Sequence, residues 1–142
     1  IMARYHMYWQ VYLHPDVKAY ELLIHSFFMR LFHIKGKQNI GIFESLDYEM
    51  DNQNFLSWDE HVMGYGFHQA LTFEDSILKD LAQRILNRQL FSWIEQPTHQ
   101  QIETIKEQLV QKGKDLAYYY HENQYKANTY LPYREDNYKE NK

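Results

Sequence analysis

The chain has 142 residues and a formal net charge of −4 at neutral pH, with an isoelectric point near 6.0. This length suits one domain with or without a small appendage, and the acidic balance gives no global reason to expect binding to nucleic acid or to a membrane surface. The absence of cysteine excludes disulfides, thiolate catalysis and zinc–thiolate sites, and no apolar run approaches the roughly 20 residues of a membrane span. We expect a cytoplasmic location.

The segment 4–14 carries an arginine, three tyrosines, a tryptophan and two histidines at helical spacing. The pattern begins almost at residue 1 without a capping residue, so we expect the chain to be the C-terminal part of a larger protein. Arg4, Tyr8 and Tyr12 are four residues apart and line one side of the helix. An arginine there can hold a phosphate while tyrosine rings cover a sugar or base. The alternative is that the rings of Tyr8 and Tyr12 lie in the core and the Arg4 side chain extends past them to solvent.

A second apolar stripe follows Pro15, whose ring disfavours helix at the residue before it. The stripe runs at helical spacing through Val17, Tyr20, Ile24, Phe27 and Leu31. The two stripes predict two helices, or one kinked helix, over about 2–34, followed by stop signals in the basic, glycine-containing segment 35–39. Residues 40–55 are mixed and acidic, and we expect a loop or short irregular structure there.

The middle of the chain predicts a further helix. Ser57 with Glu60 three residues later has the arrangement of a capping box, which predicts a helix over about 58–71. Gly64 and Gly66 cost this helix stability, about 1 kcal/mol each relative to alanine. They can also allow a close backbone contact.

Thr72, with Asp75 at the third position after it, predicts the cap of the next helix. Its apolar face consists of Ile77, Leu78, Leu81, Ile85 and Leu86. The short apolar segment 90–94 precedes Pro97 and is a strand candidate.

The last part of the chain predicts a helix followed by extended segments. Thr98 and Gln101 have capping spacing, and the helix that follows should end at Gly113. The aromatic segment 116–120 is a second strand candidate, and 125–133 is a third.

These elements predict a mainly α fold. We expect a multi-helical body over 1–95 and a small α+β appendage over 96–142, which ends in a polar tail.

On spacing alone, no complete catalytic site is present. The eight histidines form no His-Glu-x-x-His pattern and no adjacent His-Asp pair, and the five glycines form no phosphate-binding loop. His61 and His68 can share a helix face, so a metal-dependent enzyme built on them is one hypothesis, although such a site needs further ligands. Exposed or hydrogen-bonded histidines are the plainer interpretation. His25 and His33 flank an apolar face, and we expect them to be partly buried.

Arg4, Tyr12 and His14, followed by a long apolar helix, resemble a motif of the HD-domain dNTP triphosphohydrolases. The likeness is strongest to the Gram-positive bacterial HD phosphohydrolases and extends to the SAM-and-HD-domain dNTP triphosphohydrolase. It continues over 56–94 as a pair of helices closed by an Arg-x-Leu-Phe motif at 88–91. Together these motifs cover about residues 1–95, so the resemblance implies that the helical body over 1–95 is the C-terminal part of an HD-type hydrolase domain.

The resemblance implies substrate contacts for three residues. The arginine that matches Arg4 contacts the substrate triphosphate, and the tyrosine that matches Tyr12 packs on or hydrogen-bonds the deoxyribose. The next position is often a glutamine that helps to read the base. Here it is Leu13, which cannot form that hydrogen bond, so base discrimination stays open.

Three further residues match an effector or interface region. His14 matches a histidine near a subunit interface where nucleotide effectors bind, although Pro15 follows it where the family often has a basic residue. Arg88 and Leu90 match residues of an effector site in regulated members, where the arginine could hold a phosphate. The alternative for Arg88 is a surface arginine near a helix C-terminus.

The family's metal ligands are a histidine, a His-Asp pair and a later aspartate, which lie upstream of the matching segment and are not found in this chain. The resemblance thus implies a divalent metal ion in the parent enzyme, with no metal ligand and no catalytic residue in this chain. It implies that the chain alone hydrolyses nothing. The implied partners are the upstream HD half, deoxynucleoside triphosphates and further copies in a dimer or tetramer, with no obligate nucleic acid and no membrane.

Two hypotheses follow. The first is the C-terminal part of a bacterial HD-type enzyme that cuts a deoxynucleoside triphosphate into nucleoside and triphosphate. The second is a non-catalytic helical oligomerisation or interaction module, in which Tyr5, Trp9 and Tyr12 form a seam with a partner. Arg4 and Tyr12 together on an open pocket wall would favour the enzyme, and a Tyr12 ring in a dry core would favour the module.

Overall fold

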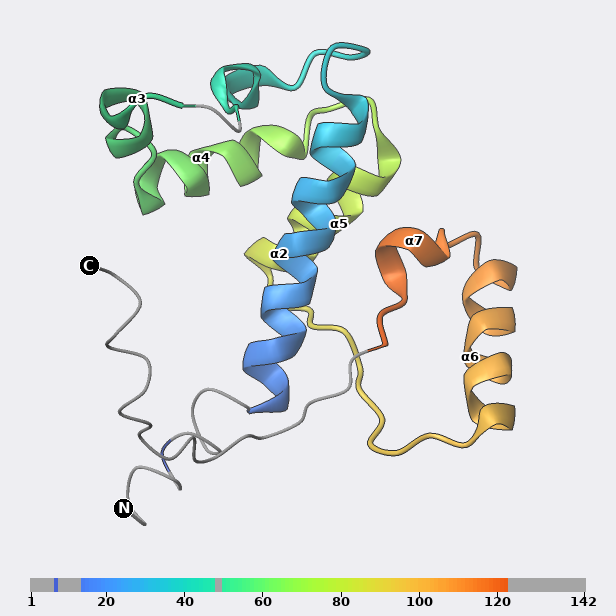
Figure 1. Ribbon diagram of the computed structural model, residues 1–142. Helices are drawn as coiled ribbons and strands as arrows, with labels where there is room; N and C mark the ends of the chain where they lie inside the picture. Colours follow the sequence, from blue (N-terminus) through green and yellow to red (C-terminus); the bar gives the residue numbers. More distant parts are fainter. Residues whose placement is uncertain (1–6, 8–13, 48–49, 123–142) are drawn as a thin grey trace, which may run out of the picture.

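The computed structural model describes residues 7, 14–47 and 50–122 (Figure 1). These residues form helices and no strand, so the expected mainly α class is confirmed for this part of the chain. The elements are α2 (Pro15–Ile34), the 3-10 helix η2 (Gly41–Ser45), α3 (Asn52–Leu56), α4 (Glu60–Ala70), α5 (Ser76–Leu86), α6 (His99–Gln111) and α7 (Leu116–Tyr119).

The long helix α2 begins and ends as the sequence predicts. Pro15 occupies the first turn, where its missing N–H costs no hydrogen bond. The last turn is closed by the Lys35 amide, which donates to the Leu31 carbonyl, and Gly36 follows with a φ of +77°. The predicted stretch before residue 14 lies outside the described residues, Met7 excepted.

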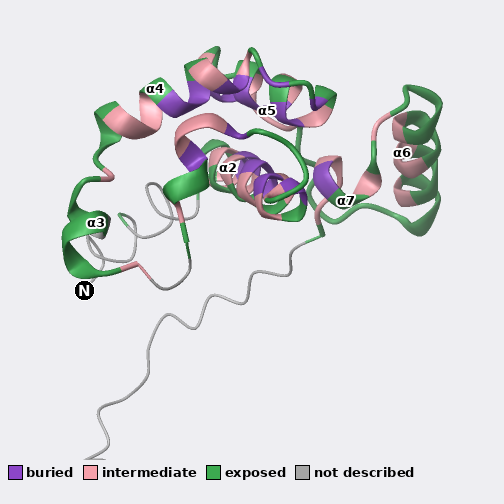
Figure 2. Ribbon diagram, turned by 90° about the horizontal axis from the view of Figure 1, so that it is seen from above, coloured by how far each residue is buried: buried purple, intermediate pink, exposed green. Residues whose placement is uncertain are grey.

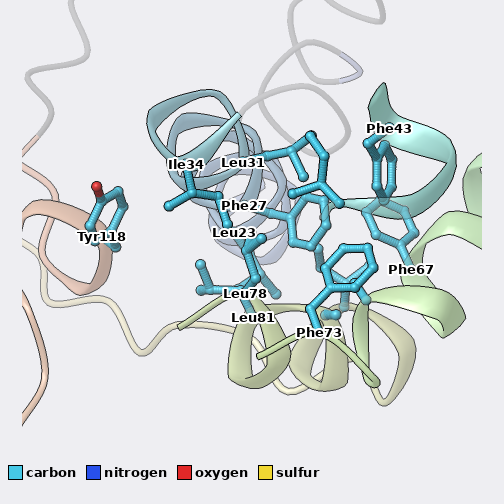
Figure 3. Packing of buried hydrophobic residues seen from close by; sticks show 14 residues of the cluster. Leu23, Phe27, Leu31, Ile34, Phe43, Phe67, Phe73, Leu78, Leu81 and Tyr118 are labelled. Atoms are coloured by element: carbon cyan, nitrogen blue, oxygen red, sulfur yellow. The ribbon is translucent and has the colours of Figure 1, made fainter. Parts of the chain in front are cut away.

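Phe27 lies at the centre of the hydrophobic core (Figure 3). Its ring meets Phe28, Phe43 and Phe67 edge to face, with centroid distances of 5.5, 5.6 and 5.1 Å. Because these rings come from α2, η2 and α4, the cluster joins three elements. The other buried members are Leu23, Leu31, Ile34, Ile40, Ala70, Phe73, Leu78, Leu81, Ala82, Ile85 and Tyr118.

Helix α4 begins two residues later than the capping pattern predicts. Its N-cap is Asp59, whose carboxylate accepts the amides of His61 and Val62 at 2.9 Å each. The Ser57 hydroxyl instead donates to the Asn54 carbonyl at 2.6 Å and closes α3. Ser57 thus closes the end of α3, and the Asp59 carboxylate caps the start of α4.

The start of α5 differs from the prediction in the same way. Its N-cap is Asp75 and not Thr72, and the Asp75 carboxylate accepts the Leu78 amide at 2.9 Å. The Thr72 hydroxyl donates to the Gln69 carbonyl at 2.8 Å, in the turn after α4. The predicted apolar face of α5 is confirmed, because its buried residues are Leu78, Leu81, Ala82 and Ile85.

The expected α+β appendage over 96–142 is not found in its described part, which is helical. Thr98 and Gln101 form the predicted capping box of α6, and Gly113 follows this helix with a φ of +68°. The strand predicted over 116–120 is wrong. Asp115 caps α7 there by accepting the Ala117 amide at 2.9 Å.

The other two strand candidates have different outcomes. The segment 90–94 has neither helical nor strand structure and pairs with no other segment that the structure describes, so the strand predicted there is not found. The candidate at 125–133 lies outside the described residues.

Helix α6 stands apart from the body of the molecule (Figures 1 and 2). Among the described helices it packs only against α7, and α7 in turn packs on α2. None of the residues of α6 is fully buried. No helix in the described ranges is both long and apolar enough to cross a bilayer.

Candidate functional site

The predicted substrate face lies outside the described residues, because Arg4, Tyr12 and Leu13 belong to the segment 8–13 and the residues before it. Whether Arg4 and Tyr12 line an open pocket, or the Tyr12 ring lies in a dry core, is therefore not tested by the described residues. The described site residues are His14, Arg88 and Leu90.

His14 caps the first turn of α2. Its Nδ1 accepts the Asp16 amide at 3.3 Å and lies 3.8 Å from the Asp16 carboxylate, and half of the side chain is exposed. Because Nδ1 acts as the acceptor, the proton of the neutral ring is on Nε2. His14 therefore keeps one polar ring atom for a contact outside the helix.

Arg88 has a left-handed backbone conformation, with a φ of +51°. It follows Asn87, the C-cap of α5. The Arg88 amide donates to the Ile85 carbonyl at 3.3 Å, and the Gln89 amide donates to the Arg84 carbonyl at 2.9 Å. This is a Schellman motif, in which glycine is favoured at the position that Arg88 occupies. An arginine there costs about 1 kcal/mol relative to glycine. Its exposed side chain makes no hydrogen bond or ion pair with any described residue.

Leu90 and Phe91 differ from the exposed Arg88 in their burial. Both are half-buried and pack against the core cluster. The Phe91 ring lies 6.3 Å from the Tyr119 ring and 5.8 Å from the His121 ring. The Arg-x-Leu-Phe motif thus has two anchoring residues and one exposed cation without a polar partner among the described residues. No hydrogen bond or ion pair in the described ranges joins His14 to Arg88.

A polar cluster around Asp80 was not predicted. Asp80 Oδ2 accepts hydrogen bonds from Arg84 Nε at 3.0 Å, Lys114 Nζ at 2.9 Å and the Tyr119 hydroxyl at 2.7 Å. Burial opposes the charge of Asp80, but these three hydrogen bonds outweigh it and hold the pKa of the carboxyl below its usual range. Burial and the hydrogen bond to Asp80 raise the pKa of Tyr119, so its hydroxyl stays a donor. Two cations on one carboxylate leave a local positive charge beside α7.

A second cluster connects α2, α5 and α7. Arg30 Nε lies 3.2 and 3.1 Å from the two Asp75 oxygens, and Arg30 Nη2 lies 2.5 Å from Oδ2. The Arg30 guanidinium also lies 5.3 Å from the centre of the Tyr118 ring, whose hydroxyl is 2.8 Å from His33 Nδ1. Burial opposes ionisation of Asp75, but Arg30 and the helix amides lower the pKa of that carboxyl. All members have partners within the fold, so this cluster is structural.

The sequence carried little signal for either cluster. Asp80 and Arg84 have helical i, i+4 spacing, which is visible in the sequence. Lys114 and Tyr119 are 34 and 39 residues from Asp80, and only the packing of α7 brings them together.

The histidine predictions have mixed outcomes. His61 and His68 are both exposed, and no group of three or more His, Asp or Glu side chains in the described ranges is placed to hold a metal ion. His25 and His33 are exposed and not partly buried as expected. They lie at the edge of α2, where α7 covers only part of the helix.

The Ile94 side chain and one side of α6 line a hollow of about 330 Å³. Its other walls are the side chains of Thr98, Gln100, Gln101, Thr104, Ile105 and Gln108. Since none of them is charged, this hollow offers amides, hydroxyls and two apolar groups, but no group for acid–base chemistry.

Comparisons with known proteins give one relative. The chain is 33% identical over 101 residues to the uncharacterized protein YwfO of Bacillus subtilis strain 168, and the match covers 67% of this chain and 23% of that protein. The chain therefore spans less than a quarter of the length of this bacterial relative, whose name assigns no activity. No protein-family model and no solved structure matches the chain.

Proposed function

We propose that the chain is the C-terminal part of an HD-superfamily deoxynucleoside triphosphate triphosphohydrolase, because its motifs resemble those of this family. The parent enzyme would cut a deoxynucleoside triphosphate into nucleoside and triphosphate at a divalent metal ion held by its upstream HD half. In this proposal, Arg4 contacts the triphosphate and Tyr12 the deoxyribose, while His14, Arg88 and Leu90 contribute to an effector site or subunit interface.

The observation that carries the proposal is the left-handed backbone conformation of Arg88 together with its exposed side chain. A residue that keeps an unfavourable backbone conformation, with a side chain that forms no hydrogen bond or ion pair with any residue the structure describes, is a candidate for contact with a ligand. Its exposed guanidinium can hold a phosphate through a bidentate hydrogen bond. Leu90 and Phe91 support this role because they fix the segment to the core just beyond it.

The test is the Arg88→Gly substitution in the full-length protein that contains this chain. Glycine suits the backbone, so the free energy of unfolding should stay level or rise by about 1 kcal/mol. Stimulation of triphosphate release by nucleotide effectors should fall about tenfold or more, since a hydrogen bond to a charged group contributes about 1.5–3 kcal/mol.

Gln96→Gly is the matched control. Gln96 is the other non-glycine residue with positive φ in the described part, at +48°, and it is also exposed. The control should show the same or better stability and unchanged effector response. An Arg88→Gly enzyme that responds to effectors as the control does would remove Arg88 from the proposed site.

One observation supports the alternative function, a non-catalytic oligomerisation or interaction module. Trp93 and Ile94 are adjacent apolar side chains that are 54% and 52% exposed, next to the hollow on α6. Exposed aromatic residues of this kind are typical of protein interfaces. A full-length protein that forms oligomers through this face but releases no triphosphate from any deoxynucleotide would favour the module.

A further inference from the structure

The Asp80 cluster holds two cations on a single carboxylate. Arg84 Nε and Lys114 Nζ both donate to Asp80 Oδ2, at 3.0 and 2.9 Å, so the guanidinium and the ammonium lie beside each other. Neither cation forms an ion pair with a second acidic side chain in the described ranges. Asp75, which also acts on this cluster, is already paired with Arg30. One positive charge of the cluster therefore has no anion to balance it.

Both cations also keep hydrogen-bond donors that meet no acceptor among the residues the structure describes. A guanidinium has five N–H groups, and Arg84 uses only the one at Nε, so both of its terminal nitrogens are left over. The Lys114 ammonium has three N–H groups and uses one of them on Asp80. The side chains of Arg84 and Lys114 are 28% and 29% exposed, so an ion from solvent can reach them.

The fold holds the two cations in place without a ligand. Tyr119 donates its hydroxyl to the same Asp80 oxygen at 2.7 Å, and its ring lies 4.5 Å from the Lys114 ammonium. Arg84 and Asp80 are one turn apart on α5, which fixes the guanidinium from the other side. A ligand that binds here does not have to order two long side chains, and this lowers the entropic cost of binding.

The residual charge and the shape of the donors indicate the class of ligand. The terminal nitrogens of a guanidinium form a planar fork that fits two oxygens of one anion. The ammonium of Lys114 is a compact charge that can bind a third oxygen. A tetrahedral phosphoryl group offers three oxygens to such a set of donors, whereas a carboxylate offers only two.

We propose that Arg84 and Lys114, held in position by Asp80, form a binding site for a phosphoryl group, either free phosphate or a phosphate ester, beside α5 and α7. Arg88 is not part of this site. The inference does not rest on the proposed enzymatic function, because it concerns only side chains within the described fold and is tested without measuring hydrolysis.

The experiment titrates the 142-residue chain with inorganic phosphate, methyl phosphate and acetate at constant ionic strength and follows the proton–nitrogen NMR spectrum. We expect phosphate to cause saturable shifts of the Arg84 Nε–H signal and of the backbone amides of 80–84 and 114–119. Acetate should bind about tenfold more weakly, since it leaves one charged donor without an oxygen. Methyl phosphate that binds as tightly as phosphate would assign the site to esters, and phosphate that binds alone would assign it to the free ion.

Arg84→Gln and Lys114→Gln test the two proposed ligand contacts. Each glutamine can still donate to Asp80 but carries no charge, so each variant should bind phosphate about tenfold or more weakly than the wild type. Lys112→Gln is the matched control, because Lys112 is exposed at the end of α6, only two residues from Lys114, and its loss changes the net charge equally. Equal losses for Lys112→Gln and Lys114→Gln would overturn the proposal, since they would indicate general attraction of anions to a basic surface.

Asp80→Asn separates a binding site from an ion-pair cluster that only stabilises the fold. The asparagine oxygen can still accept the Tyr119 hydroxyl, but the charge that competes with the ligand is gone. The proposed site should then bind phosphate about fivefold or more tightly, because two cations are left for one anion. The same spectra report whether α5 and α7 stay folded. A folded Asp80→Asn chain that binds phosphate no better than the wild type, or a wild type whose signals do not saturate, would overturn the proposal.

Discussion

At the scale of single residues, Gly66 shows how close packing fixes a residue type. A Cβ atom at this position would lie 2.5 Å from Cζ of the Phe43 ring, and Phe43 is fully buried against Phe27 and Phe67. The ring cannot move away without disturbing the core, so Gly66→Ala should lower the free energy of unfolding by about 1–3 kcal/mol, as overpacking does. Urea unfolding of the 142-residue chain measures the change.

Gly64, on the same helix, is the control for this prediction. Nothing lies within 4 Å of a Cβ built there. Gly64→Ala should therefore stabilise the chain by up to about 1 kcal/mol through helix propensity alone. Equal effects of the two substitutions would show that the Phe43 contact does not decide the identity of residue 66.

The sequence predicts that glycines in this helix can allow a close contact, but it does not distinguish Gly66 from Gly64, since the distinction depends on the position of a ring 23 residues away.

At the scale of elements, the Arg30–Asp75 pair holds α2 against the first turn of α5 and the ring of Tyr118 on α7. Asp75→Asn keeps a good helix cap but removes the charge that Arg30 faces. We expect a loss of about 2–3 kcal/mol in unfolding free energy, the usual contribution of hydrogen bonds to a charged group. Because Asp75 has a lowered pKa in the fold, its contribution is present above the unfolded pKa of about 3.9 and disappears as the pH falls through the folded value.

Asp59→Asn is the matched variant, since Asp59 also caps a helix but faces no arginine. Its unfolding midpoint should stay nearly unchanged at neutral pH. The difference between the two variants should shrink in acid, where the wild-type Asp75 carboxyl is itself protonated. A difference that does not shrink as the pH falls would mean that the amide disturbs the cap and not the ion pair.

The elements also show what the sequence can and cannot predict. Apolar periodicity predicted α2 and α5, and capping patterns predicted α4 and α6, because both signals are local properties of the chain. The starts of α4 and α5 were misplaced because Ser57 and Thr72 close the preceding helices, and the aspartates just after them are the caps. The strand predicted at 116–120 was wrong because Tyr118 packs on Arg30 and His33, contacts that lie 88 and 85 residues apart in sequence and outweigh the β propensity of tyrosine.

At the scale of the whole molecule, the described part is a helical body with one outlying helix, α6, connected through α7. The Asp80 cluster joins α5 to the end of α6 and to α7 and could not be predicted, because it depends on how distant segments fold back. The proposed substrate residues precede α2 in the sequence, and α2 is fixed in the core along most of its length. A helix held in this way is a suitable support for neighbouring residues that must be positioned precisely against a triphosphate.

The enzymatic proposal is tested by comparing the 142-residue chain with the full-length protein in an assay of triphosphate release from deoxynucleotides with added divalent metal. We expect release by the full-length protein and none by the chain alone, because the proposed metal ligands belong to the upstream half. In the full-length protein, Arg4→Ala should raise the activation barrier by about 2–4 kcal/mol through lost contacts to phosphate charge. Lys79→Ala, a change at an exposed position of α5, should leave the rate unchanged. Comparable activity of the isolated chain would contradict the proposal as a whole, whereas an unchanged rate for Arg4→Ala in an active parent would remove only that residue from the site.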